Sequence, residues 1–294
     1  MIKHLYRQAL AEKTDALIQE EILKKIVTVI FCMLMVAGMA FAGGKGDTSA
    51  SGVDNSLQNI MTKKTLVLGL DDSFPPMGFR NEKNEIVGYD IDMAKEVAKR
   101  IGVELVLQPI DWAAKEQELN TREIDCIWNG FTITEERKKN VLYTPPYLKN
   151  AQVIVVKGNS PVNSIKDLAG KKAGTQEGSS SVDAIDNAPA FKASLKEVVL
   201  YKDFLTALMD LDVGGTDAVV IDLVVANDNI NRSGKSFKML KETLEDEELG
   251  IGFRLGDKAL ADKVWATLLE MAKDGTVAKI TTQWMGADIS VIGK

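Results

Sequence analysis

The residues of this sequence that could do chemistry gather at four places where a predicted strand ends. They offer an arginine, serine hydroxyls at a predicted helix start, two separate carboxylates and an aromatic ring. Arginine and the free N–H groups of a helix N-terminus both favour a carboxylate, and a buried carboxylate pairs with an ammonium group. Such a set suits a small zwitterion. The clusters are Asp71 to Phe74, Gly130 to Arg137, Gln176 to Ser181, and Asp222.

From residue types alone, each group can be given a role toward such a zwitterion. Arg137 and the N–H groups near Ser179 and Ser180 would hold the carboxylate. Asp222 would pair with the ammonium group, and Phe74 would cover an apolar stem. The residues therefore predict a binding site assembled from distant parts of the chain.

Each of these residues also has a plain structural explanation. Asp222 can be a helix N-cap, and the serines of 179–181 can cap a helix. Phe74 and Trp128 can be ordinary core aromatics. The sequence Thr-Glu-Glu-Arg that ends at Arg137 can be a helix start whose arginine faces water. The residue types leave these alternatives open.

The composition excludes several classes of function. The chain has 294 residues, of which 45% are hydrophobic and 27% charged, enough for one large or two medium domains. The net charge of −6 and the lack of a basic block argue against a nucleic-acid partner. His4 is the only histidine, so a histidine-based catalytic apparatus or metal site is not expected.

Residues 1–42 are predicted to be an N-terminal extension and a signal peptide. Two lysines at 24 and 25 precede an uncharged run, residues 26–42, that closes in Ala-Phe-Ala. This order of basic start, apolar middle and small-x-small end predicts export to the periplasm with cleavage after Ala42. A membrane anchor is the alternative, but the run is short for a bilayer, which takes roughly 20 residues. Charged residues 1–23 suggest that translation begins near Leu23.

After cleavage, Cys126 would be the only cysteine, so no intramolecular disulfide is expected.

Residues 43–63 are small and polar at first and predict a flexible leader, with structure beginning near Thr65. From there strands and helices alternate, which predicts an α/β fold with parallel sheets covered by helices. Predicted strands cover 65–70, 104–108, 124–128, 153–156, 172–175, 198–201, 217–221 and 251–254. Predicted helices cover 91–101, 112–119, 164–168, 203–209, 222–228, 260–273 and a last segment ending at 285, and Asp90 is the expected N-cap of the first.

Several motifs in this order resemble the family-3 bacterial extracellular solute-binding proteins, the periplasmic receptors of polar amino acid ABC importers. The resemblance covers about residues 65–285. The motifs are Gly69-Leu-Asp-Asp-Ser-Phe-Pro-Pro76, Val87-Gly-Tyr-Asp-Ile-Asp92, Gly130-Phe-Thr-Ile-Thr-Glu-Glu-Arg137, Asp167-Leu-Ala-Gly-Lys171, Gln176-Glu-Gly-Ser-Ser180 and Asp217-Ala-Val-Val-Ile-Asp222.

The resemblance implies a two-lobe periplasmic binding protein, a type II clamshell that closes over one free L-amino acid. Two crossing segments are expected near 149–151 and 242–248. Lobe 1 would then combine 64–149 with 249–294, and lobe 2 would be 150–248. A monomer that docks on an ABC transporter membrane permease is implied, without a cofactor or a metal.

Roles for individual residues follow from the same resemblance. It implies that Arg137 binds the ligand carboxylate, helped by Thr132 and the backbone at Ser179 and Ser180. Asp222 takes the α-ammonium group together with the carbonyl of Gly130. Further expected contacts are Phe74 along the ligand side chain and Asp71 at its tip.

The sequence departs from the family pattern at positions that bear on ligand choice. Gly130 stands where a serine is common, and Trp128 and Asn129 replace small residues, so Trp128 is included among the candidate ligand-binding residues. Asp71 lies beside Asp72, and charge repulsion favours a basic or amide side chain over a carboxylate one. Arginine, lysine, histidine or glutamine is therefore expected ahead of glutamate.

Two other functions fit the same resemblance less well. The superfamily includes periplasmic dehydratases that act on carboxylated ring substrates, in which a pocket carboxylate such as Asp71 would be the general acid. No second catalytic group is marked in the sequence. A sensor domain of a larger receptor is disfavoured, because the sequence to Lys294 carries no later membrane or kinase-like segment.

Overall fold

The computed structural model describes residues 53–294, and Asp54–Lys294 form one compact unit. The predicted signal peptide and the first part of the predicted leader lie outside the described residues. Within residues 53–294, every helix is too short or too polar to cross a membrane.

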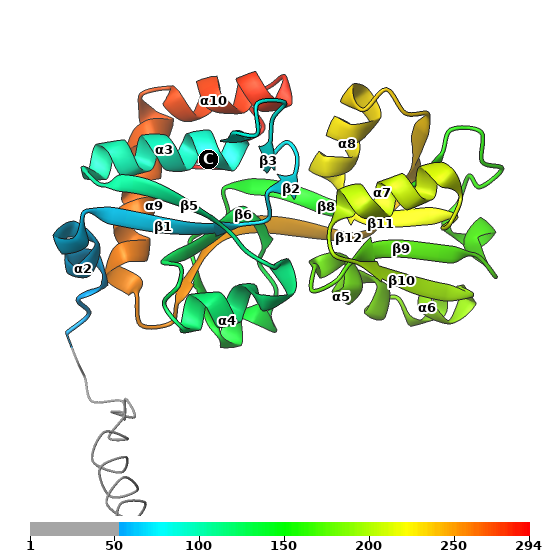
Figure 1. Ribbon diagram of the computed structural model, residues 1–294, viewed down its shortest axis with the longest axis horizontal. Coiled ribbons are helices and arrows are strands. Elements are labelled where there is room, and N and C mark those ends of the chain that lie inside the picture. Colours follow the sequence, from blue (N-terminus) through cyan, green and yellow to red (C-terminus); the bar gives the residue numbers. More distant parts are fainter. Residues whose placement is uncertain (1–52) are drawn as a thin grey trace, which may run out of the picture. The chain divides into compact units, whose positions relative to one another are not determined.

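The strands and helices of the described part alternate along most of the chain (Figure 1). The strands are β1 Thr65–Leu70, β2 Ser73–Phe74, β3 Gly78–Arg80, β4 Ile86–Val87, β5 Glu104–Pro109, β6 Cys126–Thr132, β7 Val141–Tyr143, β8 Leu148–Lys157, β9 Lys172–Gln176, β10 Glu197–Tyr201, β11 Ala218–Asp222 and β12 Phe237–Arg254. The α-helices are α2 Ser56–Lys63, α3 Tyr89–Ile101, α4 Lys115–Asn120, α5 Ser180–Asp186, α6 Pro189–Ser194, α7 Phe204–Val213, α8 Leu223–Arg232, α9 Lys258–Lys273 and α10 Thr276–Met285. Short 3₁₀ helices cover Trp112–Ala114, Arg137–Lys139 and Ile165–Leu168.

Across the described residues one sheet runs in the order β10-β9-β11-β8-β12-β6-β1-β5, and β7 pairs with β12. The outer strands pair in parallel, β1 with β5 and β6 at one end and β9 with β10 and β11 at the other. The long strands β8 and β12 pair with each other in antiparallel fashion between these ends. This is a mixed α/β fold in two lobes joined by two crossing strands (Figure 1).

We refer to the lobes by their elements. Lobe 1 contains β1 to β7, α2 to α4, α9 and α10, and lobe 2 contains β9 to β11 and α5 to α8 (Figure 1). The antiparallel pairing of β8 and β12 includes Lys149 with Glu248 and Ala151 with Asp246. The exact residue boundaries given above for each lobe stay a prediction.

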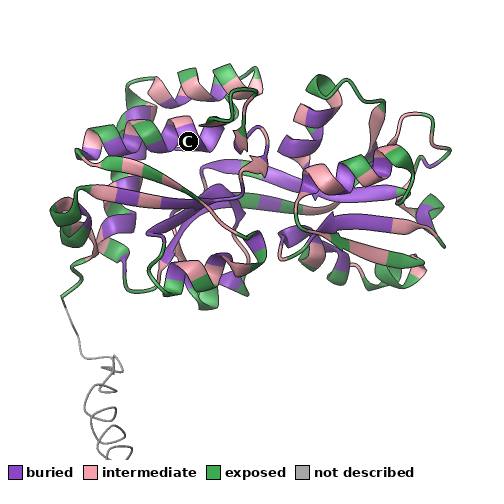
Figure 2. Cartoon of the chain, viewed as in Figure 1, coloured by how far each residue is buried: buried purple, intermediate pink, exposed green. Residues whose placement is uncertain are grey.

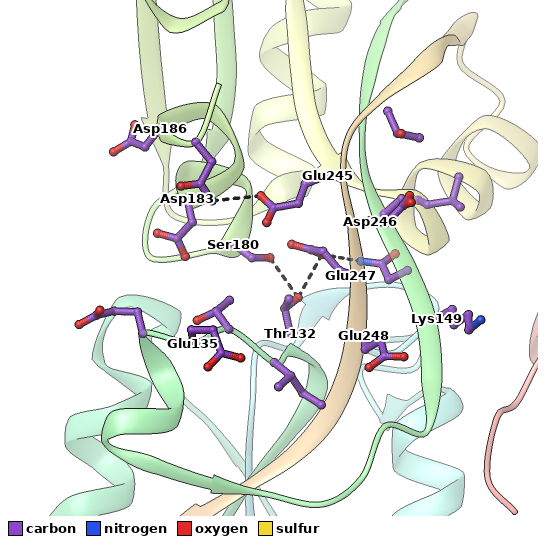
Figure 3. Close-up of a pocket in the computed structure, with 18 of the residues that line it drawn as sticks. Thr132, Glu135, Lys149, Ser180, Asp183, Asp186, Glu245, Asp246, Glu247 and Glu248 are labelled. Atoms are coloured by element: carbon purple, nitrogen blue, oxygen red, sulfur yellow. Dashed lines mark hydrogen bonds between the residues drawn. The ribbon is translucent and has the colours of Figure 1, made fainter. Parts of the chain in front are cut away.

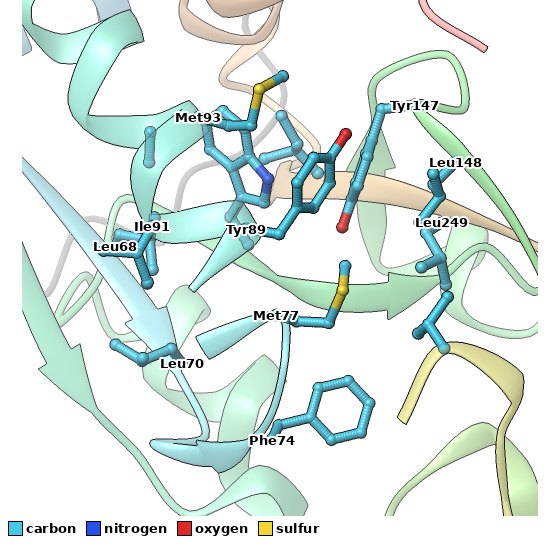
Figure 4. Close-up of a cluster of buried hydrophobic side chains, with 14 of the residues drawn as sticks. Leu68, Leu70, Phe74, Met77, Tyr89, Ile91, Met93, Tyr147, Leu148 and Leu249 are labelled. Carbon is cyan, nitrogen blue, oxygen red and sulfur yellow. The ribbon is translucent and has the colours of Figure 1, made fainter. Parts of the chain in front are cut away.

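Buried apolar strands form the centre of both lobes. Every residue of β6 and of β11 is buried, as expected for strands covered on both faces (Figure 2). In lobe 1 the side chains of β1 pack against α3, whose apolar positions fall at helical spacing. Figure 4 shows part of this core, with Phe74 and Met77 next to one another at its edge. The core thus reaches the end of β1, where the first chemical cluster begins.

Helix α3 shows how the sequence sets an element's limits. Gly102 takes the left-handed conformation with a φ of 84° and ends the helix, as predicted. The expected N-cap is wrong, because the helix begins at Tyr89 with Gly88 as its cap, and the Asp90 side chain is not used for capping. The Asp90 carboxylate instead accepts the N–H of Gly130 at 2.7 Å and the Tyr147 hydroxyl at 2.9 Å.

Two segments differ from the sequence-based expectation. Residues 56–63, expected in a flexible leader, form helix α2, because Ile60 is buried and Ser56 accepts the N–H of Leu260 at 3.1 Å. The helix start that the sequence Thr-Glu-Glu-Arg suggested at Arg137 is only the 3₁₀ turn Arg137–Lys139. A single turn has little aligned dipole, so Arg137 must act through its side chain and not through a helix N-terminus.

Candidate functional site

A narrow cavity lies between the two lobes and is lined by residues from both. Its volume open to water is about 10 Å³, roughly the room that one water needs. It contains every candidate ligand-binding residue named above except Trp128. The lining residues are Asp71, Phe74, Trp112, Asn129, Gly130, Thr132, Arg137, Gln176, Ser179, Ser180, Phe204 and Asp222.

Arg137 is held between the lobes by its guanidinium group. One nitrogen donates to the carbonyl of Thr132 in β6 at 3.0 Å, and another donates to the carbonyl of Gly178 in lobe 2 at 3.1 Å. The group lies over the ring of Phe131, 4.9 Å from the ring centre. Arg137 is 7% exposed and forms no ion pair with a described residue. A buried guanidinium group without a carboxylate partner is suited to receive one from a ligand.

Gly130 shapes the end of β6. Its φ is 59°, and a Cβ there would lie 2.7 Å from the Phe74 ring. Only glycine takes this conformation readily, and only glycine leaves Phe74 in place. The register of β6 with β12 also shifts next to this position, as expected where the pairing is locally irregular. The missing serine side chain therefore has a structural reason.

Asp222 ends β11 in lobe 2 and is 3% exposed. It precedes α8, yet its side chain makes no capping hydrogen bond, so the N-cap explanation does not account for it. Asn150 Nδ2 donates to Asp222 at 2.6 Å and to Glu247 at 3.0 Å. Burial, together with the negative charge of Glu247, raises the pKa of Asp222. A cation placed beside Asp222 would relieve this buried negative charge.

Glu247 connects the crossing strands to both lobes. Besides Asn150, its carboxylate accepts from Gln152 in β8 at 2.9 Å and from the Thr132 hydroxyl at 3.2 Å. Ser180 donates to the Thr132 hydroxyl at 3.0 Å. Figure 3 shows Thr132, Ser180 and Glu247 converging from β6, α5 and β12. Thr132 and Ser180 thus link the lobes directly at the cavity wall.

Asp71 stands at the end of β1 and is 8% exposed. Its carboxylate accepts the Ser73 N–H at 2.8 Å and the Gln176 amide at 2.7 Å, and the second of these bonds joins the two lobes. The Asn129 side chain accepts the Asp71 N–H at 3.0 Å. Burial raises the pKa of Asp71 to about 6, with Asp203 among the smaller causes. Asp71 therefore places a partly charged acceptor at one end of the cavity.

Aromatic rings cover the apolar part of the cavity. Phe74 from lobe 1 and Phe204 from α7 of lobe 2 lie with ring centres 5.7 Å apart and tilted by 37°. Trp112 lines the cavity near them and packs edge-on against Phe131. An aliphatic or planar ligand side chain would find rings contributed by both lobes.

Ser179 uses its polar groups inside its own loop. Its hydroxyl donates to the carbonyl of Gln176 at 2.7 Å, and its N–H donates to the same carbonyl at 3.3 Å. It stands at the N-cap of α5 without a side-chain capping bond. Ser180, the first residue of that helix, is 5% exposed and faces Thr132. Of the two serines, Ser180 has the hydroxyl directed at the other lobe.

Trp128 is the one candidate ligand-binding residue that the structure does not bring to the cavity. It is 1% exposed and packs on Tyr147 with ring centres 6.5 Å apart. Cys126 and Trp128 pack into the core that contains α3, and Ile127 between them packs into another cluster. Trp128 has the same parity along β6 as Gly130 and Thr132, so simple alternation does not separate it from the site; the irregular pairing of β6 with β12 lies between Ile127 and Phe131, and Trp128 packs in the core.

Several residues at the site were not assigned roles from the sequence. Gln176 and Asn129 had a detectable signal, since Gln176 opens a quoted cluster and Asn129 follows the apolar strand predicted at 124–128. Phe204 and Glu247 carried none, because an aromatic residue at a helix start and an acid in a charged segment are common. Among residues 53–294, no group of three or more histidine, cysteine or acidic side chains could hold a metal ion.

A second, larger cavity of about 1060 Å³ lies beside the crossing strands (Figure 3). It shares Thr132 and Ser180 with the narrow cavity, and carboxylates predominate among its charged residues. These carboxylates are Glu135, Glu136, Asp183, Asp186, Glu245, Asp246, Glu247 and Glu248, against Lys138 and Lys149.

Comparison with known proteins agrees with this architecture. A family model described as bacterial extracellular solute-binding proteins, family 3, matches residues 66–287. The L-cystine-binding protein TcyJ of Escherichia coli strain K12 is 31% identical over 255 residues, which cover 86% of this chain and 94% of TcyJ.

Solved structures resemble the chain over both lobes. An ABC uptake transporter substrate-binding protein from Streptococcus pneumoniae with bound histidine has a TM-score of 0.79 and 35% identity, covering 82% of this chain and 100% of that one. The ancestral amino acid-binding protein AncCDT-1, a precursor of cyclohexadienyl dehydratase, has a TM-score of 0.72 and 32% identity, covering 78% and 99%. Since the family model spans most of the sequence, the chain belongs to the bacterial extracellular solute-binding proteins of family 3.

Proposed function

We propose that this protein binds one free L-amino acid between its lobes and delivers it to the membrane permease of an ABC transporter. The observation that carries the proposal is that Arg137 from lobe 1 and Asp222 from lobe 2 are both buried and line the same cavity. The guanidinium group is ready for the α-carboxylate, and the buried carboxylate is ready for the α-ammonium group. The names of the relatives, which bind cystine or histidine, support an amino acid as the ligand.

Binding is coupled to closure of the lobes. The cavity in the closed arrangement has only about 10 Å³ open to water, so the lobes or their side chains must move to admit an amino acid. A ligand that touches Arg137 and Asp222 at once stabilises the closed form over the open one, because the two residues belong to different lobes. The closed form then docks on the permease.

The ligand is a polar amino acid with a basic or amide side chain. Among the residues that line the cavity, the carboxylates Asp71 and Asp222 face a single guanidinium group, that of Arg137. A cationic or neutral side chain reduces the negative charge near Asp71, whereas an acidic one increases it. The Phe74 and Phe204 rings would cover the aliphatic or planar part of that side chain, and Gln176 would fix the Asp71 carboxylate beside its tip.

A thermal-shift panel tests the proposal. The protein is freed of bound ligand by unfolding and refolding, and its melting temperature is measured with each of the common L-amino acids. Arginine, lysine, histidine or glutamine should give the largest rise, because a ligand that binds only the folded state stabilises it. The largest rise with glutamate or a branched aliphatic amino acid would contradict the ligand class. The absence of any rise would contradict the function.

A dehydratase acting on a carboxylated ring substrate is the second candidate. The observation in its favour is Asp71, whose carboxyl group is buried and has a pKa raised to about 6, so that part of it is protonated near neutral pH. The likeness to a dehydratase precursor is consistent with this chemistry. Turnover of prephenate or arogenate by the purified protein, lost in Asp71→Asn, would favour this candidate over the receptor.

The remaining parts of the proposal concern the cell. The chain is exported to the periplasm by a signal peptide cleaved after Ala42, and it acts as a monomer. N-terminal sequencing of the exported protein tests the cleavage site. Size-exclusion chromatography with light scattering tests the monomer.

A further inference from the structure

The carbonyl of Gly178 in lobe 2 accepts hydrogen bonds from two cationic side chains of lobe 1. Lys115 Nζ donates to it at 2.8 Å, and Arg137 donates to it at 3.1 Å. Lys115 also donates to the carbonyl of Trp112 at 3.1 Å. It begins helix α4, is 5% exposed and has no ion pair within the described part of the chain. Lys115 thus uses its buried ammonium group for a hydrogen bond between the lobes.

The backbones of the lobes also touch at this point. A Cβ at Gly178 would lie 2.9 Å from the Ala113 Cα, closer than real Cβ atoms approach such an atom. Gly178 has a φ of 70°, so glycine is favoured there for its conformation as well. Ala113 lies in the 3₁₀ turn just before Lys115, and one short segment of lobe 1 therefore provides both the close approach and the hydrogen bond.

We propose that Lys115 and Gly178 form an interlobe latch that makes closure of the clamshell depend on an anionic ligand. The inference rests on the proposed function. Closing brings Lys115 and Arg137 together on one carbonyl with no carboxylate from the protein beside them. Two buried cations without an anion are costly, and a ligand carboxylate at Arg137 offsets that cost. Lys115 is a positioning residue that holds the lobes together once the ligand is bound.

The electrostatics of Lys115 agree with this arrangement. Burial, together with the positive charge of Arg137, lowers the pKa of Lys115 to about 7. Glu116, Asp183 and Asp111 act weakly in the opposite direction. A ligand carboxylate between the cations would favour the charged form of Lys115 and so strengthen its bond to Gly178.

Gly178→Ala and Lys115→Met test the latch from both sides. Gly170→Ala is the matched control for the glycine, because its φ is 71° and a Cβ there meets no atom within 4 Å. Lys99→Met on the exposed face of α3 is the control for loss of a lysine, since that side chain is 78% exposed. Both glycine variants carry the same backbone strain, and only Gly178→Ala obstructs the contact with Ala113.

The readouts are small-angle scattering for closure and stopped-flow tryptophan fluorescence for kinetics, with a saturating mixture of the common L-amino acids as the probe. Gly178→Ala and Lys115→Met should each speed dissociation by about tenfold to a hundredfold, as expected for loss of an interlobe bond to a charged group, while association stays near that of the wild type. The two control variants should dissociate like the wild type.

The outcomes separate the latch from the proposed function. If the wild type shrinks with the mixture and both test variants shrink and dissociate like it, the latch is refuted and the receptor function stands. If Gly170→Ala dissociates as fast as Gly178→Ala, backbone strain is the cause and the latch is again refuted. If the wild type itself neither shrinks nor responds, the amino acid receptor function fails, and the latch fails with it.

Discussion

Asp222→Asn should make the ligand-free protein more stable while it removes amino acid binding. The Asp222 and Glu247 carboxylates share one donor, Asn150 Nδ2, at 2.6 Å and 3.0 Å. Asparagine keeps the acceptor oxygen for Asn150 and removes one of two buried negative charges. The same change removes the partner of the ligand ammonium group. Stability and function are therefore expected to move in opposite directions.

The size of the effect follows from the distance between the charges. Because both oxygens bond to one nitrogen, they lie no more than 5.6 Å apart, the sum of the two distances. Two unit charges at that separation repel by roughly 3 kcal/mol at the effective dielectric constant of about 20 that describes protein sites. Because 5.6 Å is the largest separation that the two oxygens can have, this value is a lower bound on their repulsion when both carboxylates are ionised.

The pH dependence of stability provides a second check on the sign of the change expected for Asp222→Asn. The pKa of Asp222 is raised in the folded state by burial and by Glu247, above the ordinary value of 3.8. At pH values between 3.8 and the raised pKa, Asp222 binds more protons in the folded state than in the unfolded state. The wild type therefore loses stability as pH rises through this range. The variant lacks this loss, so its advantage should grow as pH rises from about 4 through the raised pKa of Asp222.

Urea unfolding of the refolded, ligand-free proteins across this pH range is the assay. Asp186→Asn is the control, because that carboxylate is about half exposed and pairs with Lys192. The account predicts a pH-dependent gain for Asp222→Asn and little change for the control. A variant that is less stable than the wild type throughout, or that still binds the amino acid with wild-type affinity, would refute the reasoning.

Three further predictions concern the ligand. Phe204→Ala should weaken binding of the best amino acid by roughly 1 to 3 kcal/mol in calorimetry, because a ring that lines the cavity is lost, and unchanged affinity would remove Phe204 from the site. Asp71→Asn should lower the preference for a basic over an amide amino acid about tenfold or more in competition binding, and an unchanged ratio would show that Asp71 does not meet the side-chain tip. Amino acid affinity should fall as pH falls toward about 5, because protons compete with the ligand ammonium group at Asp222, and an affinity that stays constant over this range would contradict that pairing.

Local patterns in the sequence were enough to predict most of the α/β elements. Strand β1 has the predicted limits because a short apolar run is bounded by polar residues and by the prolines that follow. Helix α3 ends at the predicted Gly102 because glycine takes the left-handed conformation there. Helix α2 was missed, because its polar sequence becomes a helix only through its packing and hydrogen bonds in the fold.

The candidate site was also only partly predictable. Asp222 ends β11, Asp71 follows β1, and Arg137 lies in the turn after β6, all at clusters that the sequence marks, and the fold brings them into one cavity. The sequence alone could not exclude Trp128 from the site, because the direction of its side chain depends on the irregular part of β6 near Gly130 and on packing against α3. The link from Asn150 to Glu247 joins residues far apart in the chain, and no local pattern marks such pairs.

The central claim is that Arg137 binds the α-carboxylate of an amino acid, and a double-mutant cycle tests it most directly. Calorimetry compares the best amino acid with its α-amide, in the wild type and in Arg137→Ala. Each single change should cost roughly 2 to 5 kcal/mol, and the two together should cost little more than one, since both remove the same ion pair. Costs that simply add, or an affinity unaffected by Arg137→Ala, would contradict the claim.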